Sequence, residues 1–297
     1  MKVDINTRFI TLIGTPLSQS FAARMQNAAY ESAGCNMVYF YTEVGNGHLA
    51  DAINAVRYMP AFAGAAVTKP NKVEVMRYLD DFDPLCKKMG SANTVVKTAE
   101  GRLIGYNTDG YGALRSLKEE LGDLRGTTVF SFGAGGTGRS VCFELANAGA
   151  KRIYICSRSA ACEELSAALN KFYPGVCFPV RAANGEAVAA ALEETDIILN
   201  LSGAGMRGKE DSTCVDKKYL KPGQVCFDAT YNPSETRFLR EAREAGCRTV
   251  NGLDMFLYQG LRQIQLWTGG RCAPLDAMRK ELADIMAEQA KQNVGAL

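Results

Sequence analysis

Short runs of hydrophobic residues alternate with longer amphipathic stretches through the second half of the chain. The runs at 128–132, 152–156, 176–180, 196–200 and 224–227 are predicted strands. Hydrophobic positions with helical spacing fill the segments 136–148, 163–172 and 186–192 between them. Strands and helices that alternate in this way are typical of βαβ units. This part of the chain therefore predicts a parallel, doubly wound α/β domain.

The first half shows shorter strand-like runs, at 9–13, 37–41, 62–67, 94–97 and 103–106. Predicted helices at 21–32 and 49–58 lie among them, and a serine cap is expected at the start of the first. Pro70 favours the first turn of a further helix. The pattern changes after Asp109, so we expect one α/β domain at residues 1–109 and a second at 110–251. Further helices are expected at 111–121, 254–267 and 275–291.

Composition places this chain of 297 residues among globular proteins, with 47% hydrophobic and 22% charged residues. A net charge of +2 without a dense run of Lys and Arg argues against nucleic acid or a membrane surface as a partner. No run approaches the roughly 20 apolar residues that cross a bilayer, and the N-terminus shows no apolar signal segment. We therefore expect a cytoplasmic protein. A monomer and a homodimer both remain open.

Cysteine and histidine usage restricts the chemistry. The ten cysteines form no CxxC pair and mostly lie in apolar segments, so we expect free thiols and no metal site. The only histidine is His48, in a glycine-rich turn where a surface position is favoured. A Ser-His-Asp triad or a histidine base would have to use it. A catalytic proton carrier is therefore expected among Lys, Asp, Glu and Tyr side chains.

A glycine-rich loop follows the predicted strand at 128–132 and opens the next helix. It consists of Gly133, Ala134, Gly135, Gly136, Thr137 and Gly138, a G-x-G-x-x-G pattern. In a Rossmann-type domain the first glycine permits a tight turn, the second lets the backbone approach a pyrophosphate, and the third allows close helix–strand packing. The helix N-terminus offers N–H groups to the phosphates. The loop therefore predicts a dinucleotide-binding domain, although a structural turn is the alternative.

The end of the second strand indicates which dinucleotide binds. Ser157, Arg158 and Ser159 follow it, and no acidic residue appears before Glu163. An Asp or Glu at this point holds the ribose hydroxyls of NAD, whereas an Arg suits the 2′-phosphate of NADP. NADP is therefore favoured, with NAD as the alternative. The alternative is that Arg158 is a solvated surface residue that binds no cofactor.

Several segments together resemble the shikimate dehydrogenase family, in the order of that family and over nearly the whole chain. They are 14–20 (GTPLSQS), 67–72 (VTKPNK), 90–94 (GSANT), 105–110 (GYNTDG), 200–206 (NLSGAGM), 228–233 (DATYNP) and 251–255 (NGLDM) followed by Gln259. The resemblance implies an N-terminal substrate domain, a Rossmann-type NAD(P)-binding domain and a C-terminal segment, 252–297, that returns to the first domain. It implies reversible hydride transfer between an alcohol and its 3-dehydro ketone.

The resemblance also implies roles for single residues. Lys72 and Asp109 would be the catalytic pair. The residues implied to bind substrate are Ser18, Ser20, Thr68, Asn93, Tyr231 and Gln259. Ser202, Met206 and Gly252 would join the glycine loop and the Ser157–Arg158–Ser159 segment at the cofactor. The structural alternatives to these roles are that Ser18 and Ser20 are helix caps and that Asn93 is a turn residue.

General acid–base chemistry is consistent with this pair. Oxidation of an alcohol requires removal of its hydroxyl proton as hydride leaves, and the reverse reaction requires a proton donor. Lys72 is expected in a first helical turn, where the helix dipole disfavours a cation and eases loss of its proton. A neighbouring Asp109 carboxylate would oppose that effect and hold the ammonium group in place.

The chain departs from the family pattern around the expected pocket. Ala66 stands where an asparagine is usual, Gln19 and Asn71 where histidines are common, and Lys69 where an apolar residue is usual. Loss of one hydrogen-bonding side chain costs on the order of 1 kcal/mol of binding. Shikimate, quinate, an aminoshikimate or another cyclic hydroxy acid therefore remain open as substrates. A nucleotide-binding regulatory protein without catalysis is the alternative class, and the presence of both Lys72 and Asp109 argues against it.

Overall fold

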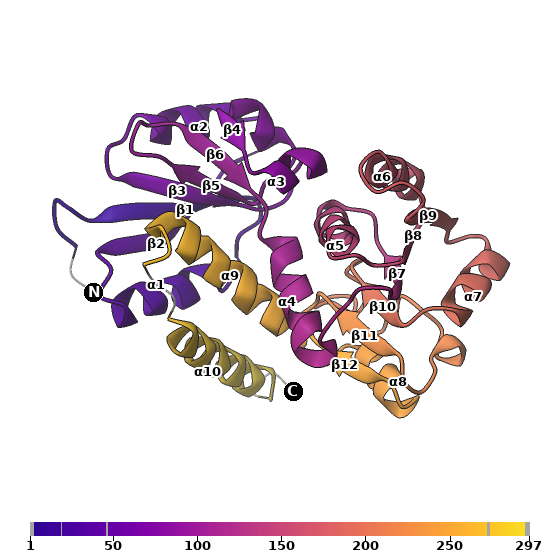
Figure 1. The fold of residues 1–297 in the computed structure, drawn as a ribbon. Coiled ribbons are helices and arrows are strands. Elements are labelled where there is room, and N and C mark those ends of the chain that lie inside the picture. Colours follow the sequence, from indigo (N-terminus) through magenta and orange to yellow (C-terminus); the bar gives the residue numbers. More distant parts are fainter. Residues whose placement is uncertain (1–2, 19, 46, 272–273, 295–297) are drawn as a thin grey trace. The chain divides into compact units, whose positions relative to one another are not determined.

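The computed structural model describes residues 3–18, 20–45, 47–271 and 274–294 (Figure 1). The chain divides into two compact units. Unit 1 comprises Met1–Thr108 and Gly260–Leu297, and unit 2 comprises Asp109–Gln259. Of the segment 252–297, the part from Gly260 onward thus groups with the N-terminal part of the chain. The helix α9 (Gly252–Thr268) contributes to both units.

Unit 1 contains a six-stranded mixed sheet in the order β2-β1-β3-β5-β6-β4. The strands are β1 (Arg8–Gly14), β2 (Met37–Glu43), β3 (Phe62–Val67), β4 (Asp81–Phe82), β5 (Thr94–Lys97) and β6 (Leu103–Tyr106). Strand β1 is parallel to β2 and β3, whereas β5 is antiparallel to β3 and β6. The first residue of β5 therefore lies at the same sheet edge as the last residues of β1, β3 and β6.

Helices cover both faces of this sheet (Figure 1). They are α1 (Ala22–Ser32), α2 (Leu49–Arg57), η1 (Glu74–Tyr78), α3 (Pro84–Met89), α10 (Leu275–Val294) and the second half of α9. On one face, Ile53 of α2, Val75 of η1 and Cys86 of α3 are buried against the strand residues Phe62 and Val95. On the other, the rings of Tyr39 and Trp267 lie 6.1 Å apart.

Small residues in β3 let helix α9 approach the sheet. All six residues of β3 are buried. A Cβ atom at Gly64 would lie 2.2 Å from the carbonyl oxygen of Val95 and 2.5 Å from Nε1 of Trp267. The indole N–H of Trp267 donates a hydrogen bond to that same carbonyl at 2.9 Å. The missing side chain at Gly64 thus makes room for the tryptophan.

Unit 2 contains six parallel strands in the order β12-β11-β10-β7-β8-β9. They are β7 (Thr128–Phe132), β8 (Arg152–Ser157), β9 (Cys177–Arg181), β10 (Ile197–Asn200), β11 (Val225–Asp228) and β12 (Arg248–Val250). The first strand lies at the centre, and the chain winds outward from it in both directions. This is the strand order of the Rossmann fold, so the α/β prediction is confirmed.

The helices of unit 2 cover both faces of its sheet (Figure 1). They are α4 (Asp109–Leu121), α5 (Gly136–Asn147), α6 (Ala161–Asn170), α7 (Gly185–Glu193), η2 (Lys217–Tyr219), α8 (Arg237–Glu244) and the first half of α9. Leu192 of α7 and Phe238 of α8 pack with Phe130, Ile198 and Cys226 of the strands. Helices α5 and α6 pack against β7, β8 and β9.

Two helices that the hydrophobic pattern did not predict, α3 and α8, begin at recognisable capping residues. Helix α3 begins with Asp83, whose carboxylate accepts hydrogen bonds from two backbone N–H groups, followed by Pro84. Helix α8 is rich in charged residues but has Thr236 as its N-cap. Capping residues would have predicted both helices.

Two local predictions are wrong. Helix α1 is capped by Phe21 without a side-chain hydrogen bond, and Ser20 Oγ accepts a hydrogen bond from the N–H of Ala22 instead. No α-helix follows Pro70, because residues 69–73 form turns that lead into the 3-10 helix η1. The carbonyl oxygen of Lys72 accepts a hydrogen bond from Ala92, a residue distant in sequence, at 2.8 Å. That tertiary hydrogen bond replaces the helical one.

The cysteines mostly follow the prediction of free thiols. Eight are free, and all of these except the half-buried Cys214 are buried. The prediction is wrong for Cys35, which is disulfide-bonded. Cys35 follows α1 and is not in an apolar strand, so the burial argument never applied to it. Cys272 and Gln19 lie outside the described residues.

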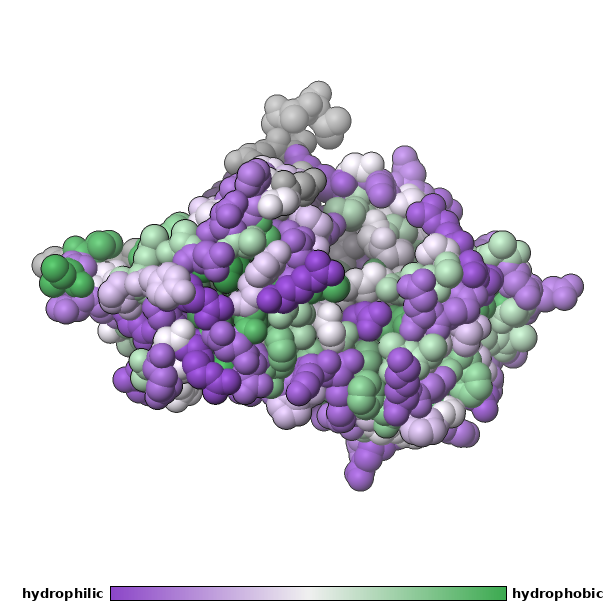
Figure 2. Space-filling view, turned by 90° about the horizontal axis from the view of Figure 1, so that it is seen from above, coloured by the Kyte–Doolittle hydropathy of each residue, from purple (hydrophilic) through white to green (hydrophobic). Residues whose placement is uncertain are grey.

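Hydrophilic residues make up most of the face shown in Figure 2, with small hydrophobic areas between them. Among the described residues, no helix is long and apolar enough to span a membrane.

We predict that Gly64→Ala destabilises unit 1 by about 3 kcal/mol, because the added methyl group overpacks the core and displaces a buried hydrogen-bond donor. Denaturant unfolding followed by the fluorescence of Trp267, the only tryptophan, measures the change. Gly185→Ala is the matched control, since nothing lies within 4 Å of a Cβ atom there. Equal stability of the two variants would contradict this packing.

Candidate functional site

The loop of unit 1 that carries Ser18 and Ser20, the serine loop, lies beside the loop that carries Thr68 and Lys72, the threonine–lysine loop, at the ends of β1 and β3. The N–H of Thr68 donates to the carbonyl of Ile13 at 2.9 Å. A Cβ atom at Gly14 would lie 2.3 Å from Cγ2 of Thr68. The absence of a side chain at Gly14 therefore lets the two loops approach each other.

Glu43, the last residue of β2, holds the serine loop. Its Oε1 accepts a hydrogen bond from Thr15 Oγ1 at 2.8 Å, and its Oε2 accepts one from the N–H of Leu17 at 3.4 Å. Ser18 is exposed and Ser20 half-buried. Ser18 makes no side-chain hydrogen bond with the residues that the structure describes, so its hydroxyl is available to a ligand.

Lys72 follows Thr68 by one turn, and the Lys72–Ala92 hydrogen bond ties its backbone to the segment before β5. Its side chain is half-buried. The five-residue 3-10 helix begins two residues later, at Glu74. The argument from a helix dipole at Lys72 is therefore wrong, because no α-helix begins there.

Asn93 is the centre of a buried polar network at this edge. Its Oδ1 accepts hydrogen bonds from the N–H of Thr108 at 2.8 Å and from Thr94 Oγ1 at 2.7 Å. Its Nδ2 donates to Thr108 Oγ1 at 3.0 Å. Gln263 of α9 donates to Thr94 Oγ1 at 3.0 Å. Asn93 is only 2% exposed. Its hydrogen bonds to Thr94 and Thr108 join β5 to the segment that precedes Asp109.

Asp109 is the first residue of α4 and is 7% exposed. A carboxylate in the first turn interacts favourably with the helix dipole. The helix is packed closely against its neighbours in unit 2. A Cβ atom at Gly110 would lie 2.4 Å from the carbonyl oxygen of Ser140 in α5.

Helix α9 also packs closely against α4. A Cβ atom at Gly112 would lie 2.9 Å from the backbone nitrogen of Gln259. Farther along α4, Glu119 accepts a hydrogen bond of 2.5 Å from the hydroxyl group of the buried Tyr258. These contacts fix Gln259, whose Nε2 donates to the carbonyl of Phe256 at 3.0 Å.

Tyr231 and Gly252 lie in the same part of unit 2. The ring of Tyr231 packs on Phe256 with 5.0 Å between centroids. A Cβ atom at Gly252 would lie 2.3 Å from the carbonyl oxygen of Ala229. Gly252 therefore lets the start of α9 approach the segment that follows β11.

The glycine loop has the geometry that its pattern predicts. Gly133 has a φ of 114°, and Gly138 could not carry a Cβ atom, which would lie 2.2 Å from the carbonyl oxygen of Gly133. Gly135 is exposed, has nothing within 4 Å of a Cβ position, and caps α5 without a side-chain hydrogen bond. Ala134, Gly136 and Thr137 complete the loop at this helix N-terminus. The space beside Gly135 and the N–H groups of the first helical turn suit a phosphate group.

The turn after β8 is fixed by its serines. Ser157 Oγ donates to the carbonyl of Ser159 at 2.7 Å and accepts from the N–H of Cys162 at 3.2 Å. Arg158 and Ser159 are exposed. The Ser157 hydroxyl group thus supports the first turn of α6, and Arg158 is left at the surface beside it.

Sequence reasoning missed the buried acid that organises the ends of β10 and β11. Asp228 has no exposed surface. Its Oδ2 accepts hydrogen bonds from Asn200 Nδ2 at 2.9 Å and Thr236 Oγ1 at 2.7 Å, and its Oδ1 accepts one from the N–H of Thr230 at 2.8 Å. Burial raises the pKa of this carboxyl, and the hydrogen bonds oppose that shift.

The same network positions the loop with Ser202 and Met206. Asn200 Oδ1 accepts a hydrogen bond from Ser202 Oγ at 2.7 Å, and Asn200 Nδ2 also donates to the carbonyl of Ala204 at 2.9 Å. Ser202 is exposed and Met206 half-buried. The sequence signal for this network was an Asp and an Asn at strand ends, because polar side chains that are buried there require hydrogen-bond partners.

Two of the positions that depart from the family pattern, Ala66 and Asn71, are buried in unit 1. Ala66 is 4% exposed and pairs with Leu12 and Thr94 in the sheet. Asn71 is 6% exposed, and its backbone carbonyl accepts a hydrogen bond from Val75. Lys69 is exposed. Ala66 therefore offers no polar side chain at the sheet edge of unit 1 where the serine loop and the threonine–lysine loop lie.

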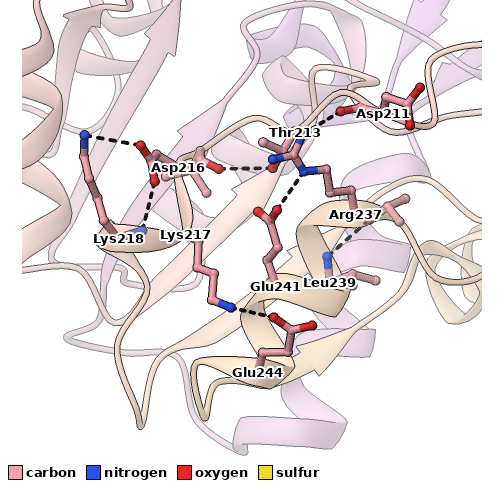
Figure 3. Close-up of polar contacts among 11 residues, drawn as sticks. Asp211, Thr213, Asp216, Lys217, Lys218, Arg237, Leu239, Glu241 and Glu244 are labelled. Carbon is pink, nitrogen blue, oxygen red and sulfur yellow. Dashed lines mark hydrogen bonds and ion pairs between the residues drawn. The ribbon is translucent and has the colours of Figure 1, made fainter.

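A cavity of about 360 Å³ in unit 2 contains none of the predicted site residues. It is lined by Thr213, Cys214, Val215, Asp216, Lys217, Arg237 and Glu241. Its charges are already paired, as Figure 3 shows: Arg237 with Glu241 at 2.7 Å, Lys217 with Glu244 at 2.6 Å and Asp216 with Lys218 at 3.2 Å. It therefore presents no uncompensated charge to a ligand.

The geometry defines a Rossmann-type unit and a second α/β unit that gathers polar loops at one sheet edge. Comparisons with known proteins agree. The shikimate dehydrogenase substrate binding domain matches residues 12–95, and the shikimate 5′-dehydrogenase C-terminal domain matches residues 252–283. Shikimate dehydrogenase (NADP(+)) of Moorella thermoacetica is 39% identical over 96% of each chain. The chain belongs to the shikimate dehydrogenase family.

Solved structures show the same likeness. Shikimate 5-dehydrogenase from Listeria monocytogenes, in complex with shikimate and NAD, has a TM-score of 0.89 and 33% identity, over 95% of this chain and 98% of that one. Quinate dehydrogenase from Corynebacterium glutamicum, in complex with NAD, has a TM-score of 0.85 and 28% identity, over 94% and 99%. The family resemblance seen in the motifs is thus confirmed.

We predict that Asp228→Asn lowers the free energy of unfolding of unit 2 by about 2 kcal/mol. An amide has one acceptor oxygen where the carboxylate has two, so at least one buried donor loses its partner. Denaturant titration measures the loss. Asp211→Asn, at an exposed acid of the same unit, should change stability by less than about 0.5 kcal/mol. An Asp228→Asn protein as stable as this control would show that the network does not hold the loops.

Proposed function

We propose that this protein is an NADP-dependent dehydrogenase that reversibly oxidises shikimate, or a closely related cyclic hydroxy acid, to its 3-dehydro ketone. The observation that carries the proposal is the gathering of Ser18, Thr68 and Lys72, together with the Asn93 network, at one sheet edge of unit 1. Membership of the family supports it, since relatives over nearly the full length bear the name shikimate dehydrogenase (NADP(+)).

Lys72 and Asp109 are the proposed catalytic pair. Lys72 would take the hydroxyl proton during oxidation and return it to the alkoxide during reduction. Asp109 would hold the ammonium group in place. The Lys72–Ala92 hydrogen bond and the hydrogen bonds between Asn93 and Thr108 support this assignment, because they restrain the backbone at Lys72 and immediately before Asp109.

The side chains proposed to bind the substrate carry hydroxyl and amide groups, which suit a polar ring with a carboxylate. Ser18 and Ser20 lie on the loop held by Glu43, and Thr68 lies directly beside it. Tyr231 and Gln259 of unit 2 complete the proposed set together with Asn93. Hydroxyl and amide groups can each donate and accept hydrogen bonds, as ring hydroxyls require.

Unit 2 is the proposed cofactor-binding unit. The N-terminus of α5 and the open space at Gly135 fit a pyrophosphate, and the exposed Arg158 fits a 2′-phosphate. A hydrogen bond to Asn200, the last residue of β10, holds the loop with Ser202 and Met206. Gly252 packs closely against the segment that follows β11. When bound, the nicotinamide supplies the acceptor of the hydride. NAD is the alternative cofactor.

A quinate dehydrogenase is the second candidate. The buried Ala66 favours it, because it removes a polar side chain from the sheet edge and so relaxes the requirement for one ring geometry. A regulatory protein without catalysis is disfavoured by the presence of Lys72 and Asp109. A homodimer and a cytoplasmic location remain predictions from the sequence.

The proposal predicts that the wild-type protein reduces NADP in the presence of shikimate or quinate, followed by the absorbance of the reduced nicotinamide. Lys72→Met should lower kcat by a factor on the order of 10² to 10⁴, as expected for loss of a general acid–base group. NADP affinity should persist. Lys87→Met, at an exposed lysine of α3 in the same unit, is the control and should retain wild-type turnover.

Full turnover in Lys72→Met would contradict the proton-transfer role. Turnover with quinate alone would select the second candidate, and tight NADP binding without turnover on either acid would favour the regulatory alternative.

We also predict that Gly135→Val weakens NADP binding by roughly tenfold or more, a loss of about 1.4 kcal/mol. The side chain would occupy the space where the backbone approaches the pyrophosphate. Because the wild-type surroundings are open and φ is −76°, the fold should be unaffected. Isothermal titration calorimetry and thermal unfolding measure the two quantities. Gly185→Val, with equally open surroundings, is the control, and equal NADP affinity in both variants would place the cofactor elsewhere.

A further inference from the structure

A second arginine lies beside Ser157 and Arg158, although it is distant in sequence. Ser157 ends β8, Arg181 ends β9, and the two residues are register partners in the parallel pair. The N–H of Ala182 donates to the carbonyl of Ser157 at 3.0 Å. Register partners in adjacent strands project to the same face of a sheet. The side chain of Arg181 therefore projects to the same face of the sheet as that of Ser157, the residue before Arg158.

An acidic residue in the first turn of α6 holds Arg181 in place. Nε of Arg181 forms an ion pair with Oε1 of Glu163. The other carboxylate oxygen, Oε2, accepts a hydrogen bond from Cys162 Sγ at 2.9 Å. The N–H of Cys162 in turn donates to Ser157 Oγ. A continuous set of contacts thus links the end of β8, the start of α6 and the end of β9.

This ion pair leaves part of the guanidinium group unused. Both terminal Nη groups of Arg181 make no hydrogen bond to the residues that the structure describes, and the side chain is 46% exposed. The arrangement also occupies Glu163, the first acid after β8. Glu163 is thereby less available to the ribose hydroxyls that distinguish NAD.

A small cavity adjoins the two strand ends. It has a volume of about 160 Å³ and is lined by Phe132, Cys156, Ala182, Val188, Cys214, Val215, Asp216 and Tyr219. Cys156 and Ala182 are the chain neighbours of Ser157 and Arg181. Side chains one residue apart in a strand project to opposite faces of a sheet, so this cavity is not part of the surface that carries Arg181.

We infer that Arg181 is a specificity-determining residue that binds the 2′-phosphate of NADP together with Arg158, while Glu163 positions its guanidinium group. The inference rests on the proposed function and deepens its choice of cofactor. Two arginines are a stronger phosphate site than the single one seen in the sequence, because each guanidinium presents donors in a planar fork. The engaged acid disfavours NAD at the same time.

The test uses 2′,5′-ADP and 5′-AMP, which differ in the 2′-phosphate alone. Isothermal titration calorimetry on the full-length protein measures both. Arg181→Gln should weaken 2′,5′-ADP binding by about 10- to 100-fold, the loss expected for a charge-assisted contact, and 5′-AMP binding by less than about threefold. Arg152→Gln is the matched control. It breaks a comparably exposed ion pair, with Glu194, at the opposite end of β8, and should change neither affinity.

The double variant Arg181→Gln/Glu163→Gln separates a direct contact from charge masking. If Arg181 contacts the phosphate, the double variant also binds 2′,5′-ADP weakly. Recovery of the wild-type affinity would overturn the inference, because Arg181 would then only neutralise Glu163. An unchanged affinity in Arg181→Gln alone, or an equal loss for both nucleotides, would overturn it as well.

These outcomes are distinguishable from failure of the proposed function. The binding measurement requires no turnover, so Arg181 can fail the test while wild-type protein still prefers 2′,5′-ADP and oxidises its substrate. Wild-type protein that binds the two nucleotides equally would instead refute the NADP preference, and the inference with it.

Discussion

The loops that carry the candidate site depend on buried polar side chains at the strand ends. Backbone groups at these ends leave the sheet and must find partners, since an unsatisfied buried polar group costs about 1–3 kcal/mol. In unit 2, Asp228 and Asn200 supply those partners and join the ends of β10 and β11. In unit 1, Asn93 does the same between β5 and the residue before Asp109. A change at either network would displace the loops, even though neither network contains Lys72 or Asp109.

Close packing through glycine is the complementary constraint. Helix α4 approaches α5 at Gly110 and α9 at Gly112, where a Cβ atom would meet backbone atoms at 2.4 Å in both cases. Asp109 is the residue directly before this packed segment. Its position is therefore set by backbone contacts on the two helices that flank α4. Protein interiors are packed densely enough that one added methyl group at such a contact must move a neighbour.

The sequence predicted the strands at 62–67, 94–97, 103–106 and 128–132 with the bounds that the structure shows, because each combines a hydrophobic run with clear flanking turns. It failed where tertiary contacts decide the backbone. The carbonyl of Lys72 bonds to Ala92 rather than to the next helical turn, and no local pattern shows that. Arg181 escaped notice for a related reason, since only the register of β8 and β9 brings it beside Ser157. The roles of Lys72 and Asp109 in proton transfer remain predictions.

The central claim is direct hydride transfer from the ring carbon that bears the oxidised hydroxyl group to the nicotinamide. Shikimate carrying deuterium on C3 tests it most directly, with mass spectrometry of the reduced cofactor after incubation with wild-type protein and NADP. The account predicts that the reduced cofactor carries one deuterium atom. Reduced cofactor without deuterium, or no reduced cofactor from shikimate or from quinate labelled in the same way, would contradict it.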